Sequence, residues 1–466
     1  MKFNIPKLYI VVGVCVLLSC TDLEPKLYSE LVPTTKFTNP DDAALGILLQ
    51  NYSNLDGYAG SVWQMQELTS ETSAAPAKFG PWDDGGVWAR LHRHEWQTTY
   101  GTFDGAWGVG FSGIASCNLN IEQLKVLGQE EGVAELRALR AVYYWLMIDL
   151  FGDVPLEVSF ATGVQNPSRE PRAKVYQFIV DELNELIDSG LLSDVTGGPY
   201  YGRMNQWSAL ALLTKVYLNA GVYTGTPQWA MAAETAKKII DGGKFILEPD
   251  YFTNFAILNT GSKENIFVIP YEKSNAGGFQ MHMQTLHPLN RLTYNFTDGP
   301  WNGFTALEEF YNSYDPTDKR KDQFIVGQQY DASGAPLLDP NGATEVDSDG
   351  DKDPDGPPLI FTPFINELTP KAFSQSGARL GKFAFESGIG VSAQNDFPVF
   401  RFARIDQVRE ARRSSSICVC FLKSVGCGVR TVVSRKCRVR TLRQLALSVQ
   451  FMQLYKSLYA NVGLRV

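Results

Sequence analysis

The clearest periodic pattern of hydrophobic and polar positions lies between residues 130 and 156. Within EEGVAELRALRAVYYWLMIDLFGDVPL, apolar residues recur three and four positions apart and form a wide stripe. This spacing predicts a buried helix, and Trp145 on the stripe is expected in the core. Gly152 is placed to end the helix, and Pro155 cannot continue it.

Other segments with helical patterns lie on both sides of this one. Near residue 41, Pro40 suits the first helical position, and the early acids Asp41 and Asp42 suit the helix dipole. The last two segments predict a helical hairpin of about the tetratricopeptide size, with Trp207 in its core. We expect glycines to break the helix at 102–127. The predicted helices are 41–54, 102–127, 171–188, 205–221 and 227–243.

Two regions lack a helical period. The stretch 73–90, SAAPAKFGPWDDGGVWAR, is rich in Gly, Pro and Trp and predicts a loop. From 251 to 400, Gly, Pro, Asn and Asp dominate, and helical segments such as 305–314 are short. The pattern therefore predicts a mainly all-α protein, in which a loop-rich insertion packs against a helical platform.

The first twenty residues predict an export signal that ends in a lipid anchor. Lys2 and Lys7 precede an eleven-residue apolar run at 8–18. This run is shorter than the roughly 20 residues that a membrane-spanning helix needs. The residues Leu-Leu-Ser-Cys at 17–20 resemble the lipobox of bacterial lipoproteins. This resemblance implies that 1–19 is removed and that Cys20 is acylated on sulfur and nitrogen. An ordinary signal peptide is the alternative.

Charge and cysteine are unevenly distributed along the 466 residues. Residues 401–466 contain 14 Lys and Arg against two acids, whereas the remainder contains 28 against 48. The net charge of -8 gives no reason to expect a nucleic-acid partner. Four of the seven cysteines lie in the basic tail, and the mature body before it holds only Cys20 and Cys117, so it uses no disulfide framework.

Several ordered blocks together resemble the SusD/RagB family. That family consists of outer-membrane lipoproteins that capture nutrients, chiefly glycans, beside a TonB-dependent transporter. The resemblance runs from Cys20 to about Ala403. The blocks are RALRAVYYWLMIDLFGDVPL, GRMNQWSALALLTKVYLNAG, GPWDDGGVWARLHRHEW, GPWNGF at 299–304 and NDFPVFRFA at 395–403.

This resemblance implies a platform of tetratricopeptide-like helix pairs and a loop-rich region that carries the binding face. It also implies an oligosaccharide ligand and a SusC-like transporter partner, over which the lipoprotein acts as a lid. Asp22 and Glu24 behind Cys20 resemble the export signal of lipoproteins that face outward from the outer membrane. The expected division is 1–19 signal peptide, 20–250 helical region, 251–403 loop-rich region and 404–466 tail.

The tail at 404–466 departs from the family pattern. Family members continue into further helices, whereas here no acid occurs after Glu410, and Arg, Ser, Cys and Val are abundant. Such a composition is typical of a coding region read in the wrong frame, and we interpret the tail as frameshifted. A genuine basic tail that binds phosphate or anionic lipid is the alternative.

Glycan capture requires flat apolar faces for pyranose rings and polar groups for their hydroxyls. Loop tryptophans beside glycine, with neighbouring Asn and Asp, supply both. Ordinary packing in the core is the alternative for each tryptophan. The candidate glycan-binding residues are Trp82, Asp83, Trp88 and Trp96 in one Gly-rich region, and Trp301 with Asn302 in another.

Alternating aspartates in VDSDGDKDPDGPPLIFTPF predict a calcium-stabilised loop, with a solvated acidic turn as the alternative. Calcium takes six to eight oxygen ligands, which closely spaced carboxylates can supply. The EF-hand spacing is not met, because Gly350 does not lie at the sixth position. No other cofactor is required. The candidate ligands are Asp347, Asp349, Asp351, Asp353 and Asp355.

No catalytic set is evident, so we expect a protein that is not an enzyme. Two acid pairs, Glu67 with Glu71 and Asp83 with Asp84, suit the two carboxylates of a glycosidase, but acids are frequent enough for pairs to arise freely. His92 and His94 have no third zinc ligand nearby. A surface glycoside hydrolase and a relative that binds peptide or protein are the alternatives.

Overall fold

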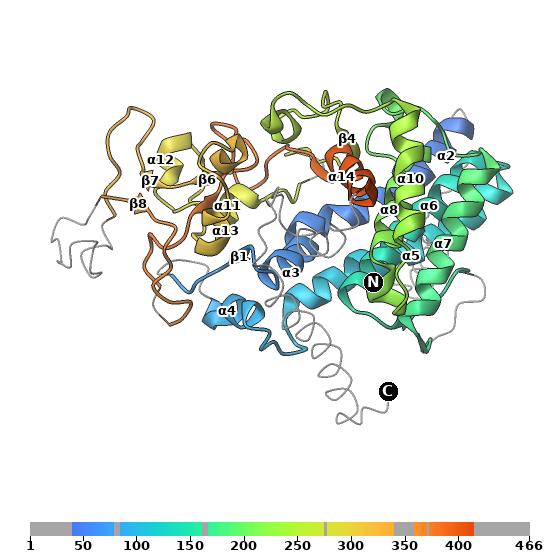
Figure 1. Ribbon diagram of the computed structural model, residues 1–466, viewed down its shortest axis with the longest axis horizontal. Coiled ribbons are helices and arrows are strands. Elements are labelled where there is room, and N and C mark those ends of the chain that lie inside the picture. The colour runs from blue at the N-terminus through green and yellow to red at the C-terminus, as the bar shows by residue number, and fades with distance from the viewer. Residues whose placement is uncertain are drawn as a thin grey trace, which may run out of the picture.

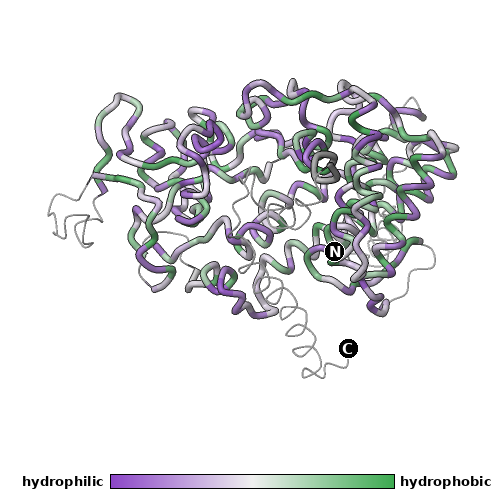
Figure 2. The backbone as a smooth tube through the Cα atoms, viewed as in Figure 1, coloured by the Kyte–Doolittle hydropathy of each residue, from purple (hydrophilic) through white to green (hydrophobic). Residues whose placement is uncertain are grey.

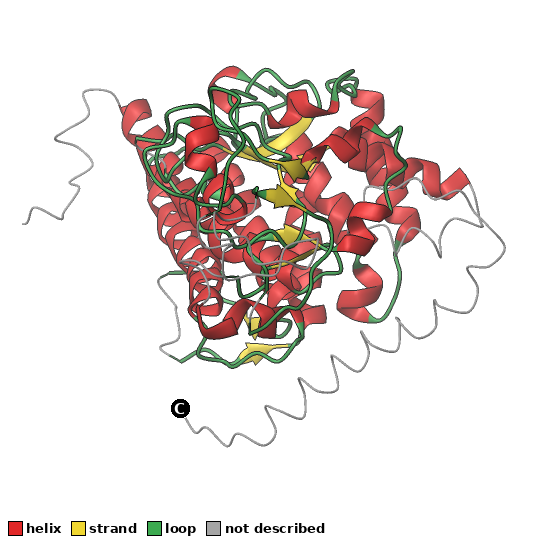
Figure 3. Ribbon diagram, turned by 90° about the vertical axis from the view of Figure 1, so that its left-hand side faces the viewer, coloured by secondary structure: helices red, strands yellow, loops and turns green. Residues whose placement is uncertain are grey.

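The computed structural model describes residues 40–78, 84–160, 166–274, 277–339, 358–370 and 372–413. Long helices pack side by side in one half of the molecule, and short helices, short strands and loops make up the other half (Figure 1). Figure 3 shows that helices and loops predominate and that the strands are few and short. The predicted fold class, a mainly all-α protein with a tetratricopeptide-like platform and a loop-rich region, is confirmed.

The helices of the platform follow the predicted segments closely. Pro40 is the first residue of α2, as predicted, but after Leu49 the chain continues as a 3-10 helix over Gln50–Gly57. Trp145 and Trp207 are buried, as predicted. The platform contains α2 (Pro40–Leu49), α3 (Trp63–Leu68), α5 (Gly101–Val126), α6 (Glu130–Leu150), α7 (Arg172–Ser189), α8 (Gln206–Leu218), α9 (Ala220–Thr224) and α10 (Trp229–Gly242).

The expectation that glycines break the helix at 102–127 is wrong, because α5 is continuous from Gly101 to Val126. A Cβ atom on Gly113 would lie only 2.4 Å from the Tyr143 ring, and one on Gly110 only 2.3 Å from Met147. Both partners belong to α6. The glycines therefore let two helices approach closely, and this packing offsets their low helix propensity.

Helices α8 and α10 pack against each other as the predicted hairpin. Asn205 caps α8, since its side chain accepts hydrogen bonds from the backbone N–H groups of Trp207 and Ser208. Helix α10 ends at Gly242, and Gly243 adopts the left-handed conformation at φ 63°. The start of this helix was predicted at Pro227, but α10 begins two residues later, at Trp229.

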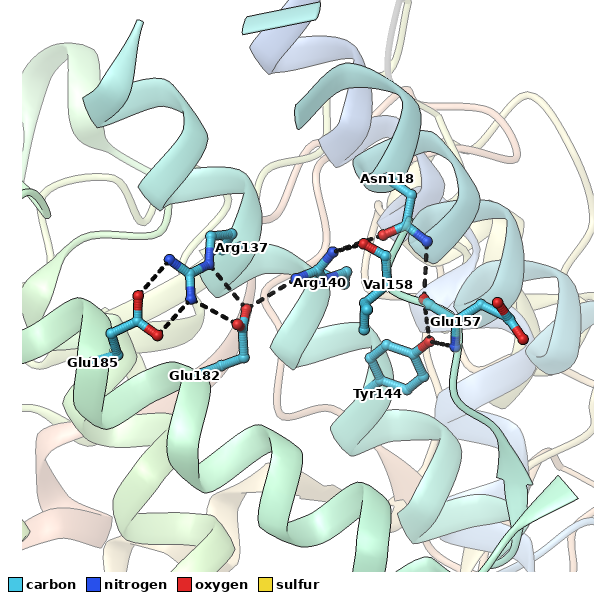
Figure 4. A network of polar contacts seen from close by, with 8 residues as sticks. All are labelled: Asn118, Arg137, Arg140, Tyr144, Glu157, Val158, Glu182 and Glu185. Atoms are coloured by element: carbon cyan, nitrogen blue, oxygen red, sulfur yellow. Dashed lines mark hydrogen bonds and ion pairs between the residues drawn. The ribbon is translucent and has the colours of Figure 1, made fainter. Parts of the chain in front are cut away.

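Buried ion pairs and hydrogen bonds link three helices of the platform (Figure 4). Arg140 on α6 is 4% exposed and donates to Glu182 on α7 at 3.0 Å and to Asn118 on α5 at 2.8 Å. Arg137, one turn earlier, donates to both Glu182 and Glu185. Since breaking a buried pair leaves an uncompensated charge, this network fixes how α5, α6 and α7 sit together.

The loop-rich region is built from short elements. Of the segment predicted as a helix at 305–314, the first two residues form β5 (Thr305–Ala306) and only Glu308–Asn312 forms helix α13. Strand β5 pairs with β1 (Ser73–Ala74), and the other short pairs are also antiparallel. Further short elements of this region are α11 (Met281–Thr285), α12 (Asn290–Tyr294), β6 (Phe324–Ile325), β7 (Gly327–Gln328), β8 (Ile360–Phe361) and β9 (Arg379–Leu380). In the platform, β2 (Val154–Pro155) and β3 (Arg169–Glu170) connect α6 to α7.

The end of the loop-rich region returns to the platform through two longer strands. Strand β4 (Asn265–Ile269) pairs antiparallel with β10 (Phe397–Arg401), with Ile269 opposite Phe397. Strand β10 leads directly into α14 (Phe402–Arg413), which packs on α10. Figure 2 shows hydrophobic and hydrophilic positions alternating along the packed helices.

Helix α14 crosses the predicted boundary between the body and the tail at residue 404. Ile405 and Val408 are buried within the main hydrophobic core. The first residues of the predicted tail therefore pack as part of the body. Residues 414–466 lie outside the described residues, and so do the signal segment and Cys20, so the division of the chain and the lipid anchor stay predictions. Within the described ranges, no helix has the length and apolar character needed to cross a membrane.

Candidate functional site

A pocket of about 350 Å³ lies between helix α4 (Val87–His92) and the N-terminal end of α5. It combines apolar, aromatic and hydroxyl-bearing side chains, which is the mixture typical of small-molecule sites. The residues that line it are Val87, Trp88 and Leu91 from α4, and Thr99, Tyr100, Gly101 and Thr102 at the start of α5.

The Gly-rich sequence before α4 determines where this helix begins. Gly85 and Gly86 have φ values of 61° and 76°, which side chains with a Cβ atom rarely adopt. The turn they form lets the chain enter a helix at Val87. The prediction that all of 73–90 is a loop is therefore wrong for its last four residues, and Trp88 lies on a helix at the edge of the loop.

Trp88 is half-buried, and both regions of the molecule support it. Its ring centroid lies 6.3 Å from that of Phe304, a fully buried residue of the loop-rich region. Trp63 of the platform contacts the same Phe304 ring at 4.9 Å. The wall of the pocket is thus held where the platform and the loop-rich region meet.

Arg90 fixes the position of the hydroxyl group of Tyr100, a residue that lines the pocket. Arg90 Nε donates a hydrogen bond to the Tyr100 hydroxyl at 2.6 Å, and Arg90 Nη1 donates to the Gly85 carbonyl at 2.9 Å. The guanidinium carbon also lies 5.7 Å from the centre of the Tyr100 ring. Because the Tyr100 oxygen accepts from Arg90, its own hydrogen is directed to another acceptor, such as a hydroxyl of a bound molecule.

Trp96 lies in the connection between α4 and α5, beside the pocket. It is half-buried, and its ring meets Phe103 edge-on at 6.1 Å and His94 at 5.5 Å. Of these two predicted glycan-binding residues, Trp88 lines the pocket, and Trp96 packs against Phe103 on the neighbouring helix α5.

The second predicted group, Trp301 with Asn302, does not line this pocket. Asn302 is 3% exposed, its amide donates to the Ser374 carbonyl, and its Oδ1 accepts from Arg379 at 2.8 Å. Its polar groups are thus used inside the protein. Trp301 is half-buried, and its backbone N–H donates to the Met283 carbonyl. This segment contacts the pocket through Phe304, two residues after Asn302, whose ring packs against Trp88.

The structure does not describe the remaining predicted ligands. Trp82, Asp83 and the five aspartates Asp347, Asp349, Asp351, Asp353 and Asp355 fall outside the described residues, so their roles stay predictions. Among the residues that the structure describes, no three His, Cys, Asp or Glu side chains group closely enough to hold a metal ion.

The candidate catalytic groups serve local contacts in the structure. The Glu67 carboxylate accepts a hydrogen bond from the Thr72 hydroxyl at 2.9 Å. The rings of His92 and His94 contact the backbone carbonyls of Leu68 and Thr69, at the end of α3. Burial lowers the pKa of His92. These contacts tie α4 to α3 and place none of the three side chains in the pocket lining.

Sequence reasoning missed several residues of the pocket. Tyr100, Thr99 and Thr102 directly follow the Gly-Trp block, and hydroxyl groups next to a loop tryptophan were a usable signal. The role of Arg90 could not be predicted from the sequence, because it depends on how helix α4 meets the start of α5.

Part of this chain is similar to SusD-like proteins. A SusD-like family model, described as "Starch-binding associating with outer membrane", matches residues 45–218. The starch-binding protein SusD of Bacteroides thetaiotaomicron is 37% identical over 130 residues, which cover 27% of this chain and 23% of that protein. A SusD-like protein of Bacteroides ovatus is 26% identical over 182 residues, 36% of this chain and 32% of that protein. The matched stretches thus span about a quarter and a third of these curated relatives.

Solved structures share the fold over most of the chain. A SusD superfamily protein from Parabacteroides distasonis has a TM-score of 0.62 at 16% identity and covers 90% of this chain and 87% of its own. A laminarin-binding SusD-like protein has a TM-score of 0.61 at 19% identity, covering 90% and 91%. Surface glycan-binding protein A from Bacteroides thetaiotaomicron, in complex with laminarihexaose, has a TM-score of 0.60 at 18% identity, covering 88% and 87%. The SusD-like family model thus matches residues 45–218, and over most of its length the chain shares the fold of SusD superfamily structures.

Proposed function

We propose that this protein binds an oligosaccharide at the cell surface and delivers it to a TonB-dependent, SusC-like outer-membrane transporter. The observation that carries the proposal is the pocket between α4 and α5, with Trp88 and Tyr100 in its lining. An indole face suits the apolar face of a pyranose ring, and hydroxyl groups suit its edge.

Relatives support the choice of a glycan as the ligand. The names of the relatives include starch and laminarin, and one similar structure holds laminarihexaose. The family description associates its members with the outer membrane. The lipobox-like sequence that ends at Cys20 fits this location and would anchor the mature protein facing outward.

The proposed activity is binding without catalysis. Glycoside hydrolysis requires two carboxyl groups that flank one glycosidic bond. The described lining of the pocket contains no Asp or Glu, and the Glu67 carboxylate bonds Thr72 instead. Energy for uptake would come from the transporter.

Affinity electrophoresis of the full mature chain in gels that contain starch, laminarin or other polysaccharides tests this proposal. We expect retardation by at least one polysaccharide and no release of shorter sugars during incubation. We also expect the protein to copurify with the transporter encoded by a neighbouring gene. Sugar release would instead identify a hydrolase. Absence of retardation in every gel, together with binding to peptides, would identify a peptide-binding relative.

A further inference from the structure

A row of aromatic side chains runs along α5 away from the pocket. Tyr100, Phe103, Trp107 and Phe111 are spaced three or four residues apart, so they share one face of the helix. The Tyr100 and Phe103 rings stack at 6.0 Å, and the Trp107 and Phe111 rings lie 4.4 Å apart at 31°. Phe151, at the end of α6, meets Trp107 edge-on at 5.2 Å. We call Phe103, Trp107, Phe111 and Phe151 the aromatic row.

The aromatic row remains partly open to solvent. Trp107 is 39% exposed, and the other three members are half-buried. The core-facing side of α5 is made by other residues, among them Ala106, Val109 and Gly110. Trp107 therefore rests on two Phe rings outside the buried core, with a large part of its indole uncovered. Burial in this chain alone does not explain a tryptophan at this position.

We propose that the aromatic row is a second subsite for the same oligosaccharide and binds the sugar units that extend beyond the pocket. This inference rests on the proposed glycan-binding function. The row begins at the pocket, since Tyr100 lines the pocket and stacks on Phe103, and Trp96 packs on the same ring. Trp107 follows Phe103 by four residues, so it lies one turn further along the same face of α5.

The geometry of α5 suits a sugar chain. Residues four apart on a helix are separated by about 6 Å along its axis, which is comparable to the length of one sugar unit. Asp104 and Ser112 are exposed at neighbouring positions of α5 and offer polar groups for hydroxyls. A stable protein partner would need roughly 800 Å² of surface on each side, far more than four mostly half-buried rings expose. A glycan is therefore the occupant that the row fits.

The test measures how affinity depends on ligand length. Isothermal titration calorimetry would use maltose to maltoheptaose and laminaribiose to laminarihexaose, with the full mature chain. Trp107→Leu keeps apolar contact with Phe111 and Phe151 but removes the flat ring, and Trp107→Tyr restores an aromatic ring. Trp229→Leu is the matched control, because Trp229 on α10 is also 39% exposed.

For the wild-type chain, affinity is expected to rise with ligand length in the series that binds. Trp107→Leu should weaken binding of the longest ligand by about ten-fold and leave the disaccharide unchanged. Trp107→Tyr should retain most of the gain, and Trp229→Leu should behave as wild type.

The outcomes separate this inference from the proposed function. If the wild type binds and Trp88→Ala abolishes binding, but Trp107→Leu keeps the wild-type length dependence, only the second subsite is overturned. An affinity that does not rise with length also overturns it. If the wild type binds neither series, or Trp88→Ala binds as well as wild type, the proposed site itself is wrong and the inference falls with it.

Discussion

The helical platform buries the cation of Arg140 against the Glu182 carboxylate, whereas the loop-rich region buries Arg379 against backbone carbonyl groups. In α6, Tyr143, Leu146 and Ile148 are fully buried. In the loop-rich region, the side chain of Arg379 is fully buried, and Lys78 beside it is only 3% exposed. The platform satisfies its backbone groups within helices, but the loop-rich region has few regular elements to do so.

Two buried basic side chains donate hydrogen bonds to the carbonyl groups of the loops. Lys78 Nζ donates to the carbonyls of Asn302 and Gly303 at 3.1 and 2.7 Å. Arg379 donates to three further carbonyls and to Asn302 Oδ1. Burial lowers the pKa of Arg379 to about 9, and burial together with Arg379 lowers that of Lys78 well below its ordinary value.

The difference teaches how a binding face is built from loops. Buried carbonyl groups need donors, and where no helix or sheet provides them, buried cationic side chains do so. Phe304 follows Gly303 of this network and supports Trp88. The loops thus hold one wall of the pocket, and the platform provides the other through α5.

Arg379→Met should sharpen this comparison most strongly. The change leaves the carbonyl groups of Ser376 and Gly377 without their side-chain donor, and the Ser374 carbonyl with only that of Asn302, so we expect a loss of about 3 kcal/mol in unfolding free energy. Protection from hydrogen exchange should fall in 277–339 and 372–401 and persist in α6 and α8. Arg291→Met, at an exposed position in the same region, is the control. Equal loss of protection in both regions would contradict the comparison.

The close contact at Gly113 and the open space at Gly108 predict opposite effects of alanine substitution on stability. Gly113→Ala places a methyl group 2.4 Å from the Tyr143 ring and should cost about 2 kcal/mol. Gly108→Ala on the same helix meets nothing within 4 Å and should stabilise the protein by roughly 0.5–1 kcal/mol. Chemical denaturation measures both. A stabilising Gly113→Ala would show that α5 and α6 are not in close contact.

The buried lysine predicts a pH dependence that belongs to the loop-rich region. Because burial lowers the pKa of Lys78 in the folded state, the unfolded chain binds more protons than the folded chain between that lowered pKa and about pH 10, and stability should rise with pH over this interval. One such group contributes at most about 1.4 kcal/mol per pH unit. Lys78→Met should flatten the slope, whereas exposed Lys125→Met should not. Identical slopes for wild type and Lys78→Met would show that Lys78 is charged in the fold.

The smallest expected effect concerns the hydroxyl that the two helices position. Tyr100→Phe removes the partner of Arg90 Nε and the hydroxyl offered to a ligand, and should weaken glycan binding by about 1 kcal/mol, or roughly five-fold. Titration calorimetry measures the change, with Tyr330→Phe on an exposed tyrosine as control. Unchanged affinity would exclude Tyr100 as a hydrogen-bonding group of the site.

The helices were predictable because their apolar stripes are local, and the exceptions depend on contacts that are distant in sequence. From the sequence alone, Gly110 and Gly113 suggest breaks in the helix. Their close contacts with Met147 and Tyr143 instead explain why glycine occurs within a continuous helix. Asn302 looked like a glycan contact, but Arg379, 77 residues later, uses its amide oxygen.

For the candidate site, the Gly-Trp block predicted from the sequence contributes to the pocket lining. Trp88 stands in this block and lines the pocket. The contribution of Arg90 was not predictable, because its hydrogen bonds to Tyr100 and Gly85 depend on the angle between α4 and the start of α5.

Binding of laminarihexaose and maltoheptaose to wild type and Trp88→Ala, measured by titration calorimetry, tests the central claim most directly. The account predicts that wild type binds at least one of them, that Trp88→Ala weakens this binding by about ten-fold or more, and that both proteins unfold cooperatively. Binding by Trp88→Ala that equals wild type would contradict the claim that the pocket between α4 and α5 captures the glycan.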